Sequence, residues 1–154
     1  MRFISTNGIP DNFFFWNIDQ NVGPKSPNQP EDVQLVQFGY FAMAPVVYDM
    51  FKNGEELKPI FAAVTPGATY NGAANDPLTL AIRAHQKFRG GTQDGHVSAM
   101  KAGSNIYPGG YAYMMSDFTR AMVRLMKHEF PRIDKHPKCP PLVREGVKRA
   151  FNVM

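Results

Sequence analysis

The chain has 154 residues, which suffices for one domain with a hydrophobic core and is too short for two full domains. Apolar residues make up 44% and aromatic residues 12%, which excludes a disordered chain, and the single Cys139 excludes an internal disulfide. The net charge of +4 is uneven, because nine of the 17 Lys and Arg residues but three of the 13 Asp and Glu residues lie between Arg120 and Met154.

The N-terminal segment is punctuated by Gly and Pro and carries one dense apolar patch. Four consecutive aromatic residues form that patch: Phe13, Phe14, Phe15 and Trp16. Four adjacent aromatic side chains have neither a helical nor a strand period, so the segment is predicted to be an ordered arm. The rings either fill the domain's own core or bind a neighbouring subunit, and they are candidate partner-binding residues.

A first helix is predicted to begin near Pro30, because proline suits the first helical turn and the acidic residues after it favour the positive end of the helix dipole. Pro45 is expected to kink or end this helix, and the Asn53-Gly54 pair is expected to stop its continuation. The apolar run from Lys58 to Val64 predicts a short strand.

A second helix is predicted to open at Asn75 or Asp76, followed by Pro77 in its first turn, and to end at Gly90-Gly91. Asp94-Gly95 then signals a tight turn. The Gly- and Tyr-rich stretch Ser104–Met115 indicates either a β-hairpin or an ordered loop.

Ser116 and Asp117 are candidate caps of a third helix that Pro131 terminates, and Leu142–Val153 reads as a short basic amphipathic helix. Basic residues on this last helix are further candidates for binding a partner subunit: Arg144, Lys148 and Arg149. A basic segment attracts nucleic acid, an anionic wall polymer or an acidic subunit, or is simply a solvated face. The few aromatic residues among these charges argue against nucleic acid.

Two halves of a pattern lie on the first and second predicted helices. The first half comprises Asn21-Val22-Gly23, Asn28, Pro30, Asp32-Val33 and Val36-Gln37. The second half comprises Ala81-Ile82, His85-Gln86, Asp94-Gly95 and Val97. In this order they resemble peptidoglycan-binding-like domains, small three-helix modules found on wall hydrolases, secreted enzymes and phage or injection-machine proteins.

The resemblance covers roughly half of the chain and implies the fold class. We expect a mainly α protein with a compact three-helix core, long ordered loops, a short β-hairpin and an extra C-terminal helix. The expected organisation is an N-terminal arm (1–28), a peptidoglycan-binding-like domain (29–130) and a basic extension (131–154). The resemblance also implies a shallow groove between the first two helices, with candidate ligand-binding residues Asp94, Gly95, His96, Tyr111 and Tyr113.

Several pattern residues have a structural explanation that needs no ligand. Gly23 supplies a turn with positive φ, Asp32 favours the helix N-terminus, and Gln37 can bridge buried backbone groups between helices. The sequence also departs from the family, since His85 replaces the helix aromatic residue and the Pro-Gly pair is displaced to Pro108-Gly109.

Motifs for catalysis and cofactor binding are weak or missing. The histidines lack zinc-ligand spacing, and no phosphate-binding glycine loop or G-x-S-x-G motif occurs, so we expect no metal, no cofactor and no catalytic residue. His85 is expected to be a satisfied, partly buried histidine. Cys139 with His136 is a remote nucleophile candidate, because the proline-bound loop shows no orienting carboxylate.

The sequence therefore predicts a non-enzymatic binding or assembly module, a component of a phage tail or contractile injection-type particle that contacts cell-wall peptidoglycan. The alternatives are a purely structural subunit, held by its aromatic arm and basic tail, and a small wall hydrolase. Without a signal-peptide pattern or a span of about 20 apolar residues, we expect cytoplasmic synthesis, no membrane span and incorporation into a larger particle.

Overall fold

A computed structural model describes residues 1–6, 13–100 and 113–152. Its strands are β1 (Arg2–Thr6) and β2 (Phe13–Asn17). Its α-helices are α1 (Pro30–Met43), α2 (Val47–Met50), α3 (Leu57–Ala62), α4 (Pro77–Phe88), α5 (Tyr113–Met126) and α6 (Pro141–Ala150). The 3-10 turns are η1 (Ala44–Val46), η2 (Lys127–Glu129) and η3 (Ile133–Lys135). The mainly α class predicted from the sequence is confirmed.

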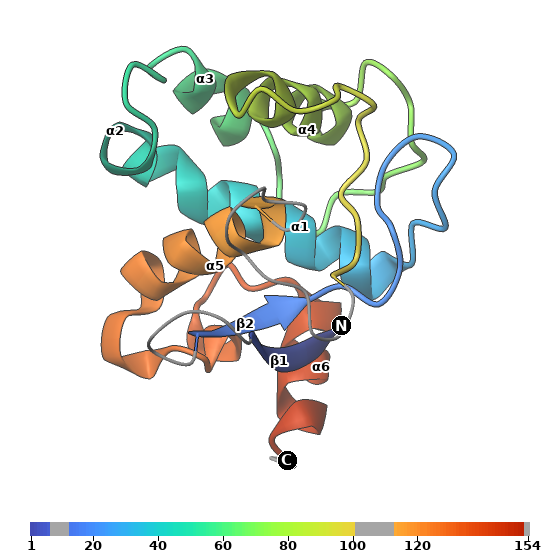
Figure 1. The fold of residues 1–154 in the computed structure, drawn as a ribbon. Coiled ribbons are helices and arrows are strands. Elements are labelled where there is room, and N and C mark those ends of the chain that lie inside the picture. Colours follow the sequence, from blue (N-terminus) through green and yellow to red (C-terminus); the bar gives the residue numbers. More distant parts are fainter. Residues whose placement is uncertain (7–12, 101–112, 153–154) are drawn as a thin grey trace.

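Helix α1 lies at the centre and contacts α3, α5 and α6. In Figure 1, α3 and α4 lie on one side of α1, while α5, the sheet and α6 lie on the other. Because it is surrounded, α1 is buried on most of its circumference rather than along a single stripe, as the burial of both Val36 and Phe38 shows.

The predicted starts of the first two helices are confirmed. Pro30 occupies the first turn of α1, followed by Glu31 and Asp32, and Pro45 falls in η1 where α1 ends. Asp76 caps α4, because its carboxylate Oδ1 accepts a hydrogen bond of 2.8 Å from the Leu78 amide. Local proline and capping chemistry therefore positions both helices of the sequence pattern.

Two element predictions are wrong. The segment Lys58–Val64 is not a strand, since Leu57–Ala62 forms α3 and Pro59 lies in its first turn, where a missing amide hydrogen costs no helical bond. Ser116 and Asp117 do not cap a helix, since α5 already begins at Tyr113. Asp117 is instead buried, and its carboxylate binds side chains of α4.

The N-terminal segment forms a two-stranded antiparallel sheet that is part of the core. Phe3 of β1 pairs with Trp16 of β2, and Ile4 pairs with Phe15. Phe15 and Trp16 are fully buried, and the Trp16 indole Nε1 donates a hydrogen bond of 3.0 Å to the carbonyl of Pro131. The segment expected as an arm thus supplies part of the chain's own interior.

One hydrophobic core runs through all three segments of the expected organisation. Residues 1–28 contribute Phe15 and Trp16, and residues 131–154 contribute Val143 and Val147 of α6, which packs on α1 and β1. Across the described ranges, no helix is both long and apolar enough to cross a membrane.

Candidate functional site

Three connecting segments, residues 21–29, 65–76 and 90–99, gather on one side of α1 and α4 and are called the loop face below (Figure 1). Val22 and Val97 join the first and third segments in an antiparallel bridge, with N···O distances of 3.0 and 2.7 Å. The bridge brings the two halves of the sequence pattern into direct contact.

Gly23 allows the first and third segments to approach closely. Its φ is 144°, and a Cβ at this position would lie 2.3 Å from the carbonyl oxygen of Gly95. His96 completes the contact, because its ring Nε2 donates a hydrogen bond of 2.5 Å to the carbonyl of Pro24. The predicted positive φ at Gly23 is confirmed, and any side chain there would separate the two loops.

Gln86 of α4 holds the Asp94-Gly95 turn. Its amide Nε2 donates to Asp94 Oδ1 and to the carbonyl of His96, both at 2.9 Å, and its Oε1 accepts from the Gly95 amide at 3.0 Å. Burial alone would raise the pKa of Asp94, but hydrogen bonds from the His96 amide and Gln86 outweigh it and lower that pKa. The Asp94 carboxylate is therefore ionised and held by the turn.

Gln37 of α1 holds the second segment in the same way. Its Nε2 donates to the carbonyl of Ala68, and its Oε1 accepts from the Gly67 amide, each at 2.9 Å. Gln37 thus bridges two backbone groups, but they belong to exposed residues of one loop rather than to the buried positions between helices that the sequence predicts. Asn28 closes its own loop through two hydrogen bonds of 2.8 Å to the backbone of Gly23.

The loop face contains a hollow of about 230 Å³, called the loop-face hollow below. A separate hollow of about 360 Å³ lies beside β1 and α6. The loop-face hollow lies between the start of α1 and the second segment. It is lined by Asn28, Pro30, Val33, Gln34, Gly67, Ala68, Thr69 and Tyr70. Its polar side chains are all uncharged, and the Tyr70 hydroxyl is fixed by a 2.7 Å hydrogen bond to Thr79 Oγ1 of α4.

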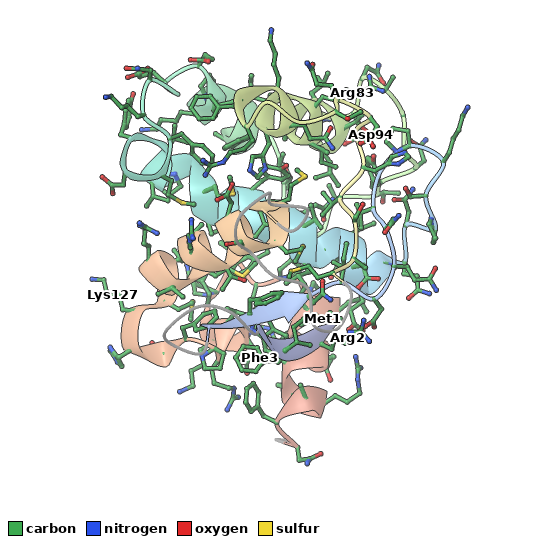
Figure 2. The ribbon with its side chains drawn as sticks, viewed as in Figure 1. Met1, Arg2, Phe3, Arg83, Asp94 and Lys127 are labelled. Atoms are coloured by element: carbon green, nitrogen blue, oxygen red, sulfur yellow. The ribbon has the colours of Figure 1, made fainter. Side chains whose placement is uncertain are left out.

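Arg83 of α4 is a cation beside the loop face, whose first segment carries the exposed Lys25. Figure 2 shows it on α4 close to Asp94, and a Cβ on Gly95 would lie 3.2 Å from its Nε. That Nε is buried and has no hydrogen-bond partner among the described residues. The sequence contained a signal for this residue, since Arg83 precedes Gln86 by three positions and so shares its helix face.

The predicted ligand-binding residues have different surroundings. Asp94 is exposed, His96 is half-buried and Gly95 is buried, and all three are engaged in the contacts that hold the loops. Tyr111 and the side chain of Tyr113 lie outside the described residues. Of the described residues among the five, Asp94, Gly95 and His96 do not line the loop-face hollow, whose residues Thr69 and Tyr70 were missed from the sequence.

A buried polar network connects α1, α4 and α5. His85 Nδ1 lies 3.1 Å from the Tyr40 hydroxyl, and its Nε2 lies 2.8 Å from Asp117 Oδ2. Arg89 binds both oxygens of Asp117, at 3.0 and 2.8 Å. Burial is the main cause that lowers the pKa of His85, so the ring is neutral, donates from Nε2 and accepts from Tyr40.

This network stabilises helix packing. His85 is fully buried, which confirms the prediction of a satisfied histidine and exceeds the expected degree of burial. The side chain of Asp117 is 3% exposed, so neither group is open to a substrate in this structure.

The predicted partner-binding residues are largely engaged inside the chain. Phe15 and Trp16 are not available to a neighbour, because they fill the chain's own core, while the side chains of Phe13 and Phe14 lie outside the described residues. Core packing is therefore the correct alternative for the two described rings.

On α6, the guanidinium of Arg144 donates to the backbone carbonyls of Asp134, His136 and Cys139. Arg149 pairs with Glu31 at 2.9 Å and Lys148 with Glu145 at 3.6 Å. Arg144 is therefore a structural residue of the C-terminal segment, whereas Lys148 and Arg149 carry charges that are already paired.

Cys139 is poorly suited to nucleophilic chemistry. Its thiol is buried, and burial raises its pKa to about 12, so the thiol is protonated at neutral pH. His136 Nδ1 accepts a hydrogen bond from the Lys138 amide rather than from the thiol. Within the parts of the chain that the structure describes, no three His, Cys, Asp or Glu side chains are grouped to hold a metal ion.

No protein-family model, curated protein or solved structure matches this chain. The resemblance to peptidoglycan-binding-like domains therefore rests on the residues of the pattern. These residues are in contact through the Val22–Val97 bridge and the Gln86 hydrogen bonds.

Proposed function

We propose that the protein is a non-catalytic binding module with a peptidoglycan-binding-like core, and that its loop face binds cell-wall peptidoglycan. The observation that carries the proposal is the loop-face hollow, because residues of the sequence pattern line it and Gln37 of the pattern fixes its wall. A phage tail or contractile injection-type particle is the setting we propose for such a module.

The chemistry of the loop-face hollow suits a glycan with attached peptide. Asn28, Gln34 and Thr69 offer uncharged donors and acceptors for sugar hydroxyls and amides, and Tyr70 offers a half-buried ring. Arg83, a half-buried residue of α4 beside the same face, adds a guanidinium whose positive charge suits a carboxylate. Peptidoglycan carries all of these groups.

Retention on purified wall sacculi tests the proposal. Thr69→Arg places a long side chain in the hollow without removing a known hydrogen bond, and Thr65→Arg adds the same charge at an exposed position outside it. We expect the wild-type protein and Thr65→Arg to be retained and Thr69→Arg to be lost. Equal retention of both variants, or no retention of the wild type at low salt, refutes binding at this hollow.

A second pair of variants tests the cation. Arg83→Gln should weaken retention, whereas Lys87→Gln, an exposed residue on the same helix, should leave it unchanged. Equal effects of the two would show that only the overall charge matters.

The alternative of a purely structural subunit has lost support, because Phe15, Trp16 and Arg144 are engaged within the chain. Light scattering and co-purification distinguish it from a binding module, since a stable monomer without partners counts against it. The alternative of a small hydrolase would be revived if the protein turned over labelled wall fragments and His96→Ala abolished that turnover.

A further inference from the structure

The outward face of α5 carries a row of cations. Arg120 and Arg124 lie four residues apart on α5, so they share one side of the helix, and Lys127 follows the end of α5 as the first residue of η2; these three cations are called the α5 row below. Arg124 and Lys127 are exposed and Arg120 is half-buried, whereas the opposite side of α5 buries Phe118 in the core. Figure 2 shows Lys127 extending away from the body of the molecule.

These three charges have no carboxylate partner among the residues that the structure describes. None of them forms a salt bridge with a described residue, whereas Arg89, Arg132 and Arg149 each pair with a carboxylate. The one recorded contact within the row is a hydrogen bond of 3.2 Å from Arg124 Nη1 to the carbonyl of Arg120. The α5 row thus presents the charges of Arg124 and Lys127 to solvent, with the half-buried Arg120 beside them.

We propose that the α5 row binds a linear phosphodiester polymer of the polyol phosphate type, which carries charge but no bases. Two of the three cations are arginines, whose guanidinium matches phosphate oxygens bidentately. None of the three lines a described cavity, so recognition depends on charge spacing rather than on an enclosed shape.

The composition of the α5 row favours this ligand over two other polyanions. The exposed apolar side chain within the row is Val123, at 38%, which is too little for the apolar centre of a protein interface. The described side chains of the row include no aromatic ring, although base stacking on aromatic rings supports the binding of single-stranded nucleic acid.

The number of cations in the α5 row determines the expected salt dependence of binding. Three phosphate contacts give a slope of log affinity against log salt of about −2, with the coefficient for a flexible single strand. Affinity should then fall about 15-fold between about 50 and 200 mM salt. Binding at the loop-face hollow, with uncharged lining side chains and Arg83 as the cation proposed beside it, would show a weaker dependence, so the two sites can be told apart.

Titration of a fluorescent glycerol phosphate oligomer, with the full chain, tests this proposal. One triple variant removes the row: Arg120→Gln, Arg124→Gln and Lys127→Gln. The matched control removes three exposed, unpaired lysines from other segments of the described chain: Lys25→Gln, Lys52→Gln and Lys87→Gln. Both triples lower the formal net charge equally.

Each cation near a polyanion contributes about fivefold to affinity, so we expect the row variant to bind about 100-fold more weakly at low salt. The affinity of the control variant should change little. Equal losses in the two triples, or no binding by the wild type, overturn the proposal. Single-stranded DNA of the same phosphate number and vesicles with anionic lipid serve as comparison ligands. If either binds the wild type more tightly than the oligomer does, the proposal is overturned and the α5 row is a binding site for that ligand.

Discussion

Replacing Gln86 by methionine should release the Asp94-Gly95 turn from α4. Methionine has a similar length and fits a buried position, so the change removes the hydrogen bonds with little change in volume. Three hydrogen bonds are lost, and the amide of Gly95 is left buried without its partner. Asp94 stays exposed and can be hydrated.

The magnitude follows from these surroundings. A buried amide left unsatisfied costs about 1–3 kcal/mol, and each bond whose partner can reach water contributes about 0.5–1 kcal/mol. Gln86→Met should therefore lower the free energy of unfolding by about 2–5 kcal/mol. For a domain of this size that corresponds to a fall in Tm of about 4–20 °C.

Urea unfolding followed by circular dichroism measures the change in the free energy of unfolding. Faster hydrogen exchange at the Gly95 and Val97 amides would show that the change destabilises the turn and the adjacent bridge. Gln93→Met is the matched control, because Gln93 is exposed in the same loop. A loss below about 0.5 kcal/mol for Gln86→Met, or a loss equal to that of Gln93→Met, would refute the assignment of Gln86 as the residue that holds the turn.

Two further predictions concern the core. Gly39→Ala should lower the free energy of unfolding by about 1–3 kcal/mol in urea titrations, because its Cβ would lie 2.7 Å from Cγ of Phe118, and Phe118→Leu should partly restore it. The free energy of unfolding should also fall as pH drops below about 6.5, because the buried His85 has a lowered pKa and the unfolded chain binds its proton first. The fall should not exceed about 1.4 kcal/mol per pH unit for this residue, and it should be reduced in His85→Gln. Burial also lowers the pKa of His136, so this residue likewise reduces the free energy of unfolding as the pH falls. An unchanged pH profile in His85→Gln would therefore assign the pH dependence to other groups such as His136.

The elements that could be predicted from the sequence are those determined by neighbouring residues. Proline and acidic residues start α1, and Asp76 with Pro77 starts α4. By contrast, α3 is a short apolar run that contains Pro59, and such a run does not distinguish a helix from a strand by its pattern.

The candidate site was predictable only in part, for the same reason. The Asp94-Gly95 turn follows from local side-chain chemistry, and for Gln37 only the capacity of its amide to bridge backbone groups does. The loop-face hollow instead depends on contact between Gln37 and a loop about 30 residues further along the chain. Asp117 likewise meets His85 across 32 residues, and no local signal indicates that pairing.

The contact between His96 and Pro24 spans 72 residues of chain, so the loop face closes a long segment when it forms. Closing a long loop costs conformational entropy, which the few contacts of the loop face must offset. We therefore expect these contacts to form late during folding and to break early during unfolding. A fragment that begins at residue 29 would lack Val22, Gly23 and Pro24 and so could not assemble this surface. A ligand of the loop face would therefore bind only chains that have folded completely. The bound ligand would in turn stabilise the loop face, the last part of the molecule to form, against local unfolding.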